Sequence, residues 1–384
     1  MGRKNKYLII ILFFLTAGVS AQERPDFRYT DSLTYRYYQE GSWDSLITEG
    51  KKAVKSGTDY KFLRQRLGYA YFIKGDYYSA RHNLERALKY DSYNPFTLEY
   101  LYYSYLNTGK DVFAGPIKER FQAGISSFRL AESLELEYSY KYSGTSLRSD
   151  PQYLRFGFST GFGHRVKLFQ SFSYYSSQVR AKESLKFLSL NQRGYYAALS
   201  LNAGRRLIIK PAYNHTVTSY NGSEKNGNLF LLSAASDFNR FSAEASFSTF
   251  RFMNEDAYQS GLQVAYVIPS RMDLYVRSNG AFVFRGGERN FVWGQAAGFR
   301  IGKKAWIEGN MTSGNMDRYN DFTGLYVYNG YDPLFFRAGG TFIYYLGEKL
   351  SFWLNYSLEK KKYYEDNTFS YNQFSYLGGF KWKL

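Results

Sequence analysis

The sequence predicts a two-domain protein, an N-terminal all-α solenoid followed by a C-terminal antiparallel transmembrane β-barrel of about 14 strands. Three observations predict this fold class. An export signal opens the chain, a repeat of 34 residues follows it, and from about residue 133 to residue 384 apolar and polar positions alternate. Alternation with a period of two gives a sheet one apolar face. In an exported chain with 40 tyrosines and 33 phenylalanines, we expect that face to meet lipid.

Residues 1–21 have the three parts of a signal peptide. Three basic residues precede an apolar segment, Tyr7 to Leu15, and small residues end at Ala21. The apolar segment is shorter than the roughly 20 residues that a transmembrane helix needs, so we expect cleavage before Gln22. The sequence contains no cysteine, which excludes disulfides, thiolate metal sites and a lipid-modified N-terminal cysteine.

Residues 22–132 carry the predicted helical repeats. Gly41, Gly75 and Gly109 recur every 34 residues, and small residues such as Gly68 and Ala80 allow paired helices to approach closely. The middle copy has the fullest set of matching positions: Leu67, Gly68, Tyr71, Gly75, Asp76, Tyr77, Ala80, Leu84, Ala87, Leu88 and Asp91. This spacing resembles that of the tetratricopeptide repeat, a helix-turn-helix unit. The flanking copies are less regular, as terminal repeats commonly are.

The resemblance implies a partner-binding groove, because repeats of this family generally bind peptides or proteins along their first helices. The candidate groove residues are Arg64, Tyr71, Glu99, Tyr102 and Tyr103. The alternative is that they are ordinary solvated or packing residues, since helical phase predicts a face and not a ligand.

Fourteen alternating segments are the expected barrel strands. They lie near residues 133–144, 152–162, 166–178, 192–203, 206–219, 227–236, 240–253, 257–268, 271–284, 290–301, 304–314, 333–346, 349–360 and 370–384. Residues 324–328 also alternate, but counting them alone gives an odd number of strands. We therefore expect residues 314–332 to form a large loop or a paired extension above the membrane. Sixteen strands are the alternative, if residues 185–190 and 324–328 both pair.

An even strand count places both ends of a barrel on the same side of the membrane. We therefore expect an outer-membrane protein whose N-terminal domain lies in the periplasm. The loops near residues 180–191, 221–226 and 314–332 are then expected to face outward. The final alternation of Phe380, Trp382 and Leu384 resembles the C-terminal signal of outer-membrane proteins, although that signal usually ends in an aromatic residue.

The formal net charge is +17, and +14 without the three basic residues of the signal. Export excludes nucleic acid as a partner and leaves outer-membrane lipid, lipopolysaccharide or anionic solutes. Because the basic residues are dispersed, they also fit solvated loops and lumen walls. Arg155, Lys210 and Arg337 are the candidate lumen-facing cations.

The sequence offers little material for catalysis. Its histidines are His82, His164 and His215, and only His215 is expected near the outer half of a strand, beside hydroxyl residues but without an evident acidic partner. A lone histidine of this kind is a weak catalytic signal. We find no phosphate-binding loop, histidine cluster or calcium loop, and therefore expect no enzyme, cofactor or metal site.

A short repeat domain followed by a barrel is similar to the architecture of YaiO-type outer-membrane proteins, a resemblance that implies architecture more than activity. We expect a non-enzymatic protein whose barrel anchors a periplasmic repeat domain that binds a protein or peptide partner, as a scaffold for envelope assembly or secretion. The alternative is a passive channel for small or anionic solutes. A lipid-modifying barrel enzyme is the least favoured interpretation.

Overall fold

The computed structural model describes residues 26–121, 129–163, 165–180, 186–204, 206–252, 255–270, 272–302, 304–366 and 368–384. The predicted signal peptide with its cleavage site, and His164, lie outside these residues. The chain divides into two compact units, the first ending at Thr108 and the second beginning at Gly109. None of the helices described in the structure is long and apolar enough to cross a bilayer.

The described part of the first unit is helical. Its helices are α2 (Phe27–Gln39), α3 (Trp43–Lys55), α4 (Lys61–Ile73), α5 (Tyr77–Ala87) and α6 (Pro95–Asn107). Gly41 and Gly75 join successive helices with φ angles of 68° and 78°, which side chains other than glycine rarely adopt. The side chains of Asp76 and Asn94 then cap α5 and α6 by accepting a backbone N–H three residues ahead. The recurrent glycines of the sequence are therefore turn residues.

Small residues bring α4 and α5 into close contact. A Cβ atom on Gly68 would lie 2.6 Å from Leu84 Cγ, so only glycine fits this approach. A buried apolar cluster between α3 and α4 completes the packing: Leu46, Ala53, Leu63, Leu67 and Ala70. The close approach of paired helices expected from Gly68 and Ala80 is thus present.

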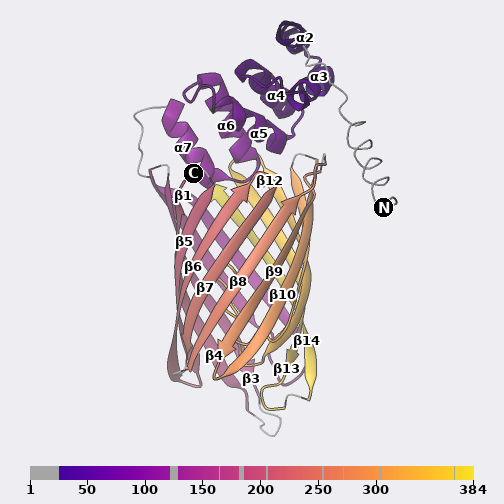
Figure 1. Cartoon of the computed structure of the whole chain (residues 1–384). Helices are drawn as coiled ribbons and strands as arrows, with labels where there is room; N and C mark the ends of the chain where they lie inside the picture. Colours follow the sequence, from indigo (N-terminus) through magenta and orange to yellow (C-terminus); the bar gives the residue numbers. More distant parts are fainter. Residues whose placement is uncertain are drawn as a thin grey trace, which may run out of the picture. The chain divides into compact units, whose positions relative to one another are not determined.

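The second unit contains a closed antiparallel barrel of fourteen strands (Figure 1). The strands are β1 (Arg129–Ser143), β2 (Gln152–Phe162), β3 (Val166–Val179), β4 (Leu188–Asn202), β5 (Leu207–Tyr220), β6 (Ser223–Phe238), β7 (Phe241–Phe252), β8 (Glu255–Val267), β9 (Tyr275–Arg285), β10 (Glu288–Ile301), β11 (Ala305–Ser313), β12 (Leu334–Leu346), β13 (Leu350–Lys362) and β14 (Ser370–Lys383). The barrel closes where β1 pairs with β14, with Ser133 opposite Lys383.

The predicted count of fourteen strands is confirmed. The alternative of sixteen is wrong, because residues 188–190 belong to β4. Residues 324–328 contribute only an isolated bridge, Asn320 to Val327, outside the named strands.

Burial alternates along the strands as the period-two pattern predicts. On β14, Gln373 and Ser375 are 1% and 2% exposed, whereas Tyr376 and Trp382 are 51% and 48% exposed. Polar side chains therefore point inward and aromatic side chains cover the outside, the reverse of a soluble barrel. An apolar outer surface of this kind is the one that a membrane barrel presents to lipid.

Helix α7 (Asp111–Phe121) falls in the second unit, although the sequence groups it with the repeats. Lys110 pairs with Asp237 at the end of β6, with 2.7 Å between Nζ and Oδ2. Asn202 at the end of β4 donates through Nδ2 to the carbonyl of Val112 at 2.9 Å. These two contacts tie the start of α7 to strand ends of the barrel.

Two of the expected outward loops differ from the prediction. Asn221 and Gly222 form a two-residue turn between β5 and β6, with φ angles of 47° and 86°, and strand pairing begins again at Ser223. Such a turn matches the twist of the flanking strands, so no long loop exists there. The loop near residues 180–191 is shortened by β4, and residues 181–185 lie outside the described part.

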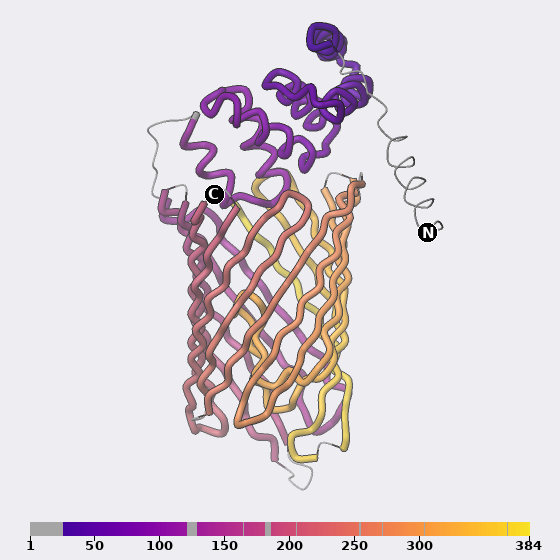
Figure 2. The backbone as a smooth tube through the Cα atoms, viewed as in Figure 1, coloured from indigo at the N-terminus to yellow at the C-terminus, as the bar shows by residue number. Residues whose placement is uncertain are grey.

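Residues 314–333, between β11 and β12, turn into the barrel, and we call them the inward loop (Figure 2). The expected large loop is present, but it turns into the barrel, so the expectation that it faces outward is wrong. Met316 and Asn320 in this loop are almost completely buried. The physical reason is space, because the wall side chains of a barrel larger than about eight strands do not fill its lumen. A long loop finds apolar surface and hydrogen-bond partners there.

Candidate functional site

The inward loop is folded as a short hairpin of its own. Arg318 N donates to the carbonyl of Tyr328 at 2.9 Å, and Tyr328 N donates to the carbonyl of Tyr319 at 2.8 Å. The rings of Tyr319 and Tyr328 stack with their centroids 5.7 Å apart. These bonds satisfy part of the loop's backbone within the loop itself, which a segment buried away from water requires.

Hydrogen bonds fix the hairpin to the inner wall of β4, β5 and β8. Gln259 Nε2 donates to the carbonyl of Asn320 at 2.8 Å, and Asn320 N donates back to Gln259 Oε1 at 3.0 Å. The Tyr196 hydroxyl donates to a loop carbonyl at 2.6 Å. Asn214 Nδ2 donates to two more loop carbonyls at 2.9 and 3.0 Å. The loop therefore lies along β4, β5 and β8, and its Tyr326 hydroxyl reaches Glu137 on β1, to which it donates at 2.5 Å.

Apolar contacts support the same placement. Leu325 and Val327 of the loop pack against a buried cluster on the wall: Tyr196, Ala212, Leu229, Leu231, Phe250 and Phe252. Gly261 on β8 leaves room for the loop residue Phe322, because a Cβ atom on Gly261 would lie 2.8 Å from its ring. The wall thus has a surface fitted to the loop.

A buried ion pair holds the end of the inward loop that leads into β12. Arg148, between β1 and β2, donates two hydrogen bonds to Asp332 at 2.6 and 2.9 Å, and both side chains are only 3% exposed. Arg148 also donates to Glu365 at 2.9 Å, and the Tyr371 hydroxyl donates to Asp332 at 2.8 Å. We call these four residues the loop latch.

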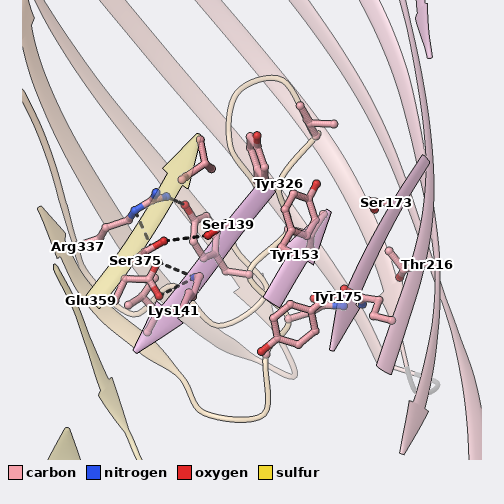
Figure 3. A pocket seen from close by; sticks show the side chains of 18 of the residues that line it. Ser139, Lys141, Tyr153, Ser173, Tyr175, Thr216, Tyr326, Arg337, Glu359 and Ser375 are labelled. Carbon is pink, nitrogen blue, oxygen red and sulfur yellow. Dashed lines mark hydrogen bonds and ion pairs between the residues drawn. The ribbon is translucent and has the colours of Figure 1, made fainter. Parts of the chain in front are cut away.

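Beside the loop, the lumen holds a cavity of about 420 Å³, lined by residues of β1–β5 and β12–β14 (Figure 3). Aromatic, hydroxyl, amide and charged side chains of the wall and the loop line it. This volume falls in the range of small-molecule sites, roughly 300–1,000 Å³.

A cluster of cations lies at one side of this cavity. Lys141 Nζ donates to both carboxylate oxygens of Glu359 at 2.8 and 2.9 Å. Nitrogens of Arg337 and Lys361 lie 3.8 Å from the same carboxylate. Three cations thus share one nearly buried carboxylate, which leaves an excess of two positive charges. We call these four residues the basic cluster.

Other lumen charges are more closely matched. Arg155 lies 3.3 and 3.2 Å from carboxylate oxygens of Glu135 and Glu137, and Lys210 lies 3.1 Å from Glu244. Arg155 and Lys210 therefore face the lumen, as Arg337 does, but are matched by acidic residues on the wall. These two cations therefore add no positive excess to that of the basic cluster.

The five groove residues predicted in the helical unit occupy different surroundings. Arg64 is buried and donates to Asp59 at 2.7 Å and to Asn83 at 2.8 Å. Its hydrogen bond holds the pKa of the Asp59 carboxyl below the ordinary value. Tyr71 packs against the apolar cluster between α3 and α4. Arg64 and Tyr71 are thus engaged in packing within the helical unit.

The other three predicted residues lie on α6. Glu99 and Tyr103 are exposed, and Tyr102 is half-buried. The rings of Tyr102 and Tyr103 meet edge to face with their centroids 5.3 Å apart.

A chain of aromatic contacts across α2, α4 and α6 was missed by the sequence analysis. Tyr69 contacts Tyr38 with ring centroids 5.4 Å apart, Tyr100 at 4.9 Å and Phe96 at 5.7 Å. All four rings are half-buried, and we call them the aromatic face. The signal was present in the sequence, because Tyr38, Tyr69 and Tyr100 recur every 31 residues.

His215, the one histidine considered for catalysis, lies on the outer surface of the barrel. Its Nδ1 lies 2.9 Å from Asn228 Oδ1, and its neighbours Asn214 and Thr216 line the lumen cavity from the opposite face of β5. Among the described residues, no three acidic, histidine or cysteine side chains are grouped to hold a metal ion. This geometry indicates no enzymatic centre at His215.

No protein-family model and no curated protein matches this sequence. The outer membrane protein Omp33 of Acinetobacter baumannii is 10% identical over 66% of this chain and 99% of its own, with a TM-score of 0.38. The P. putida toluene transporter TodX is 8% identical over 67% of this chain and 91% of its own, with a TM-score of 0.45. A point mutant of MamA is 20% identical over 27% of this chain and 74% of its own, with a TM-score of 0.25. Sequence identities and TM-scores this low do not support any conclusion about function.

Proposed function

We propose that the protein is an outer-membrane channel for small anionic solutes. The observation that carries this proposal is the cavity between the inward loop and the basic cluster. A lumen narrowed by a loop brings a passing solute close to fixed charges, and low-dielectric walls strengthen their field. An excess of positive charge at the narrowed level favours anions, as rings of basic side chains do in anion pores.

A barrel that served only as an anchor would not need a polar cavity or an ordered loop inside it. In this chain the inward loop is fixed by hydrogen bonds to β1, β4, β5, β7, β8 and β12 and by the buried pair of Arg148 and Asp332. Burying a charged pair is costly unless its geometry is good. The many polar contacts that hold the loop in this one position support a function for the lumen beyond anchoring.

The test is conductance of the purified full chain in planar lipid bilayers. We expect steady single-channel currents, and a reversal potential in a potassium chloride gradient that reports chloride permeating faster than potassium. The preference for chloride over potassium should weaken as the salt concentration rises, because the charges of the basic cluster are then screened over a shorter distance. Failure to conduct, or a preference for potassium at low salt, would contradict the channel.

We also propose that the helical unit is tetratricopeptide-like, lies in the periplasm and binds a protein or peptide of the cell envelope. The aromatic face favours this second function, because aromatic side chains are enriched at protein interfaces. Tyr35 on α2 and Phe62 on α4, the helices that also carry Tyr38 and Tyr69, are about half exposed, and exposed aromatics on neighbouring helices provide a contact surface.

Site-specific photo-crosslinking tests the helical unit in the full chain. A photoreactive residue at Phe62 or Tyr103 should give a discrete crosslinked product in intact cells, whereas the same residue at Lys89, exposed just beyond α5, should not. Equal labelling from all three positions would show that the helical unit has no preferred binding face.

A further inference from the structure

We propose that the outer wall of the barrel carries a binding site for lipid A, the phosphorylated acyl lipid of lipopolysaccharide. Two lysines at one end of β13 would hold a phosphate, and a groove beside that strand would hold an acyl chain. This inference goes beyond the proposed channel, because it concerns the outside of the barrel and not its lumen. It rests on the proposed orientation, with the helical unit in the periplasm.

The groove lies on the outer face of β1 and β11–β14 and has a volume of about 680 Å³. Two of its lining residues, Gly340 on β12 and Gly378 on β14, carry no side chain. Exposed apolar and tyrosine side chains form most of the remaining lining: Tyr138, Tyr140, Phe342, Leu354, Tyr356 and Tyr376. A hydrocarbon chain fits such a lining, because it makes no demand for hydrogen bonds.

Packing within the protein does not require the two glycines of the groove. A Cβ atom on Gly340 or Gly378 would approach other residues no closer than 3.6 and 3.4 Å, which are ordinary contacts, and neither residue has a positive φ angle. Their chain neighbours differ, since a Cβ atom on Gly339 or Gly379 would lie within 2.5 or 2.4 Å of another residue. The inward glycines are thus needed by the wall, whereas the outward glycines open the groove.

The two lysines follow the apolar outer face of β13. The outward positions of this strand are Leu350, Phe352, Leu354, Tyr356, Leu358, Lys360 and Lys362. A membrane barrel presents to lipid an apolar band about 25 Å tall, so the change from leucine to lysine marks the level of the lipid headgroups. The neighbouring strand β14 changes at the same level, because Asn372 follows Phe374 on its outer face and pairs with Lys360.

Both lysines rest on aromatic rings. Lys360 Nζ lies 5.7 Å from the ring centroid of Phe336, and Lys362 Nζ lies 5.7 Å from that of Phe335. These distances fall within the range of cation–π contacts. Within the part of the chain that the structure describes, neither ammonium group forms an ion pair, whereas Lys361 between them faces Glu359 in the lumen. The outer lysines therefore keep their charge for an anion outside the barrel.

Acidic residues near this rim have other partners. Arg251, an outward cation on β7, lies 3.6 Å from Asp256 on β8. Glu365 and Asp366, on the loop after β13, accept hydrogen bonds from other side chains. The outer end of β13 thus differs from the paired rim at β7 and β8, and its charge is complementary to a phosphate.

The lysines and the groove are spaced as the parts of one lipid. Lys360 and Tyr356 lie on the same face of β13, and at about 3.3 Å per residue they are about 13 Å apart. A lipid whose phosphate contacts Lys360 therefore has its acyl chains beside the groove. With the helical unit in the periplasm this rim faces the outer leaflet, where lipid A carries more phosphate groups and more acyl chains than a phospholipid.

The test is native mass spectrometry of the purified full chain in detergent, titrated with bisphosphorylated lipid A or with phosphatidylglycerol. We expect one lipid A molecule per protein to remain bound at a concentration about tenfold lower than phosphatidylglycerol requires, since one additional charge-assisted contact corresponds to about a factor of ten. Equal binding of the two lipids, or a preference for phosphatidylglycerol, would overturn the site.

Charge variants assign the headgroup. The double variant Lys360→Gln with Lys362→Gln should weaken lipid A binding roughly twentyfold, because each basic residue near an anionic headgroup strengthens binding about fivefold. Arg251→Gln removes another outward cation of the rim and is the matched control, which should leave lipid A binding unchanged. Equal losses in both would show that lipid A responds only to net charge and would refute the site.

Groove variants assign the acyl chain. Gly340→Val fills the groove, and the barrel should still fold, because the space beside Gly340 is open and β-branched residues suit strands. We expect lipid A binding to weaken several-fold. Ala245→Val adds the same side chain to the exposed outer face of β7 and should have no effect. Unchanged binding by Gly340→Val would contradict the groove.

The lipid site and the channel are tested independently. Conductance is measured in bilayers of phosphatidylcholine, which has no net charge, so Lys360 has no anionic lipid to hold there and Lys360→Glu reports surface charge alone. A protein that binds lipid A through these residues without conducting would contradict only the channel. A conducting protein whose lipid A binding ignores both groups of variants would overturn only the lipid site.

Discussion

Replacing Arg148 with methionine is expected to free the end of the inward loop that leads into β12 and to raise the single-channel conductance several-fold. The reason is the burial of its partner, because Asp332 is 3% exposed and would lose two hydrogen bonds from a cation. Breaking a buried ion pair by removing one member costs about 3–5 kcal/mol. The carboxylate avoids that cost by moving to water, and the loop moves with it.

Two comparison variants make the Arg148 result specific. Arg193→Met removes a cation that pairs with Glu224 at 2.6 Å while both side chains are more than half exposed. Exposed pairs contribute about 0–1 kcal/mol, so its conductance should match the original protein. Adding Asp332→Asn to Arg148→Met removes the unpaired charge. The conductance of this double variant should fall part of the way back to that of the original protein. A folded Arg148→Met barrel with unaltered conductance would show that the latch does not hold the loop.

The strand pattern was predictable because the polarity of successive residues in a strand shows which of its faces meets lipid and which meets the lumen. On β14, the residues facing lipid and the residues facing the lumen alternate in polarity at every step from Gln373 to Tyr376. No distant part of the chain is needed to interpret that alternation. The same local information placed the turn glycines Gly41 and Gly75, whose positive φ angles require glycine.

The inward loop was not predictable because distant residues determine its direction. Asn320 bonds to Gln259, 61 residues away, and Asn214 bonds to a loop carbonyl 110 residues away. Gly261, which makes room for Phe322, is one glycine among many in the strands. Nothing local distinguishes a loop that enters the lumen from one that leaves it.

The basic cluster was only partly visible for the same reason. Arg337 was expected to face the lumen from alternation, but Lys141 and Glu359 are 218 residues apart and meet only because β1 closes on β14. In the helical unit, periodicity indicated helix faces but not their neighbours. Arg64 was therefore predicted for a groove, although it bonds to Asp59, five residues earlier, and to Asn83 on α5.

Lys361→Glu is expected to abolish or reverse the preference of the channel for anions. The substitution changes the basic cluster from an excess of two positive charges to none, at the level where the inward loop narrows the lumen. The nearby cations already have acidic partners, since Arg155 and Lys381 pair with Glu135 and Glu137, and Arg148 pairs with Asp332 and Glu365. They therefore do not offset the added carboxylate. The reversal potential in a potassium chloride gradient should move toward or past zero.

The contrast with Lys360→Glu decides whether the lumen sets selectivity. Both substitutions change the charge by the same amount on adjacent residues of β13, but Lys361 lines the cavity and Lys360 is exposed on the other face. If surface charge alone set the preference, both variants would shift the reversal potential equally. If the basic cluster sets it, only Lys361→Glu shifts it. The difference should persist in part at 1 M salt, where the screening length falls to about 3 Å, because charges within the lumen are screened less than those at the surface.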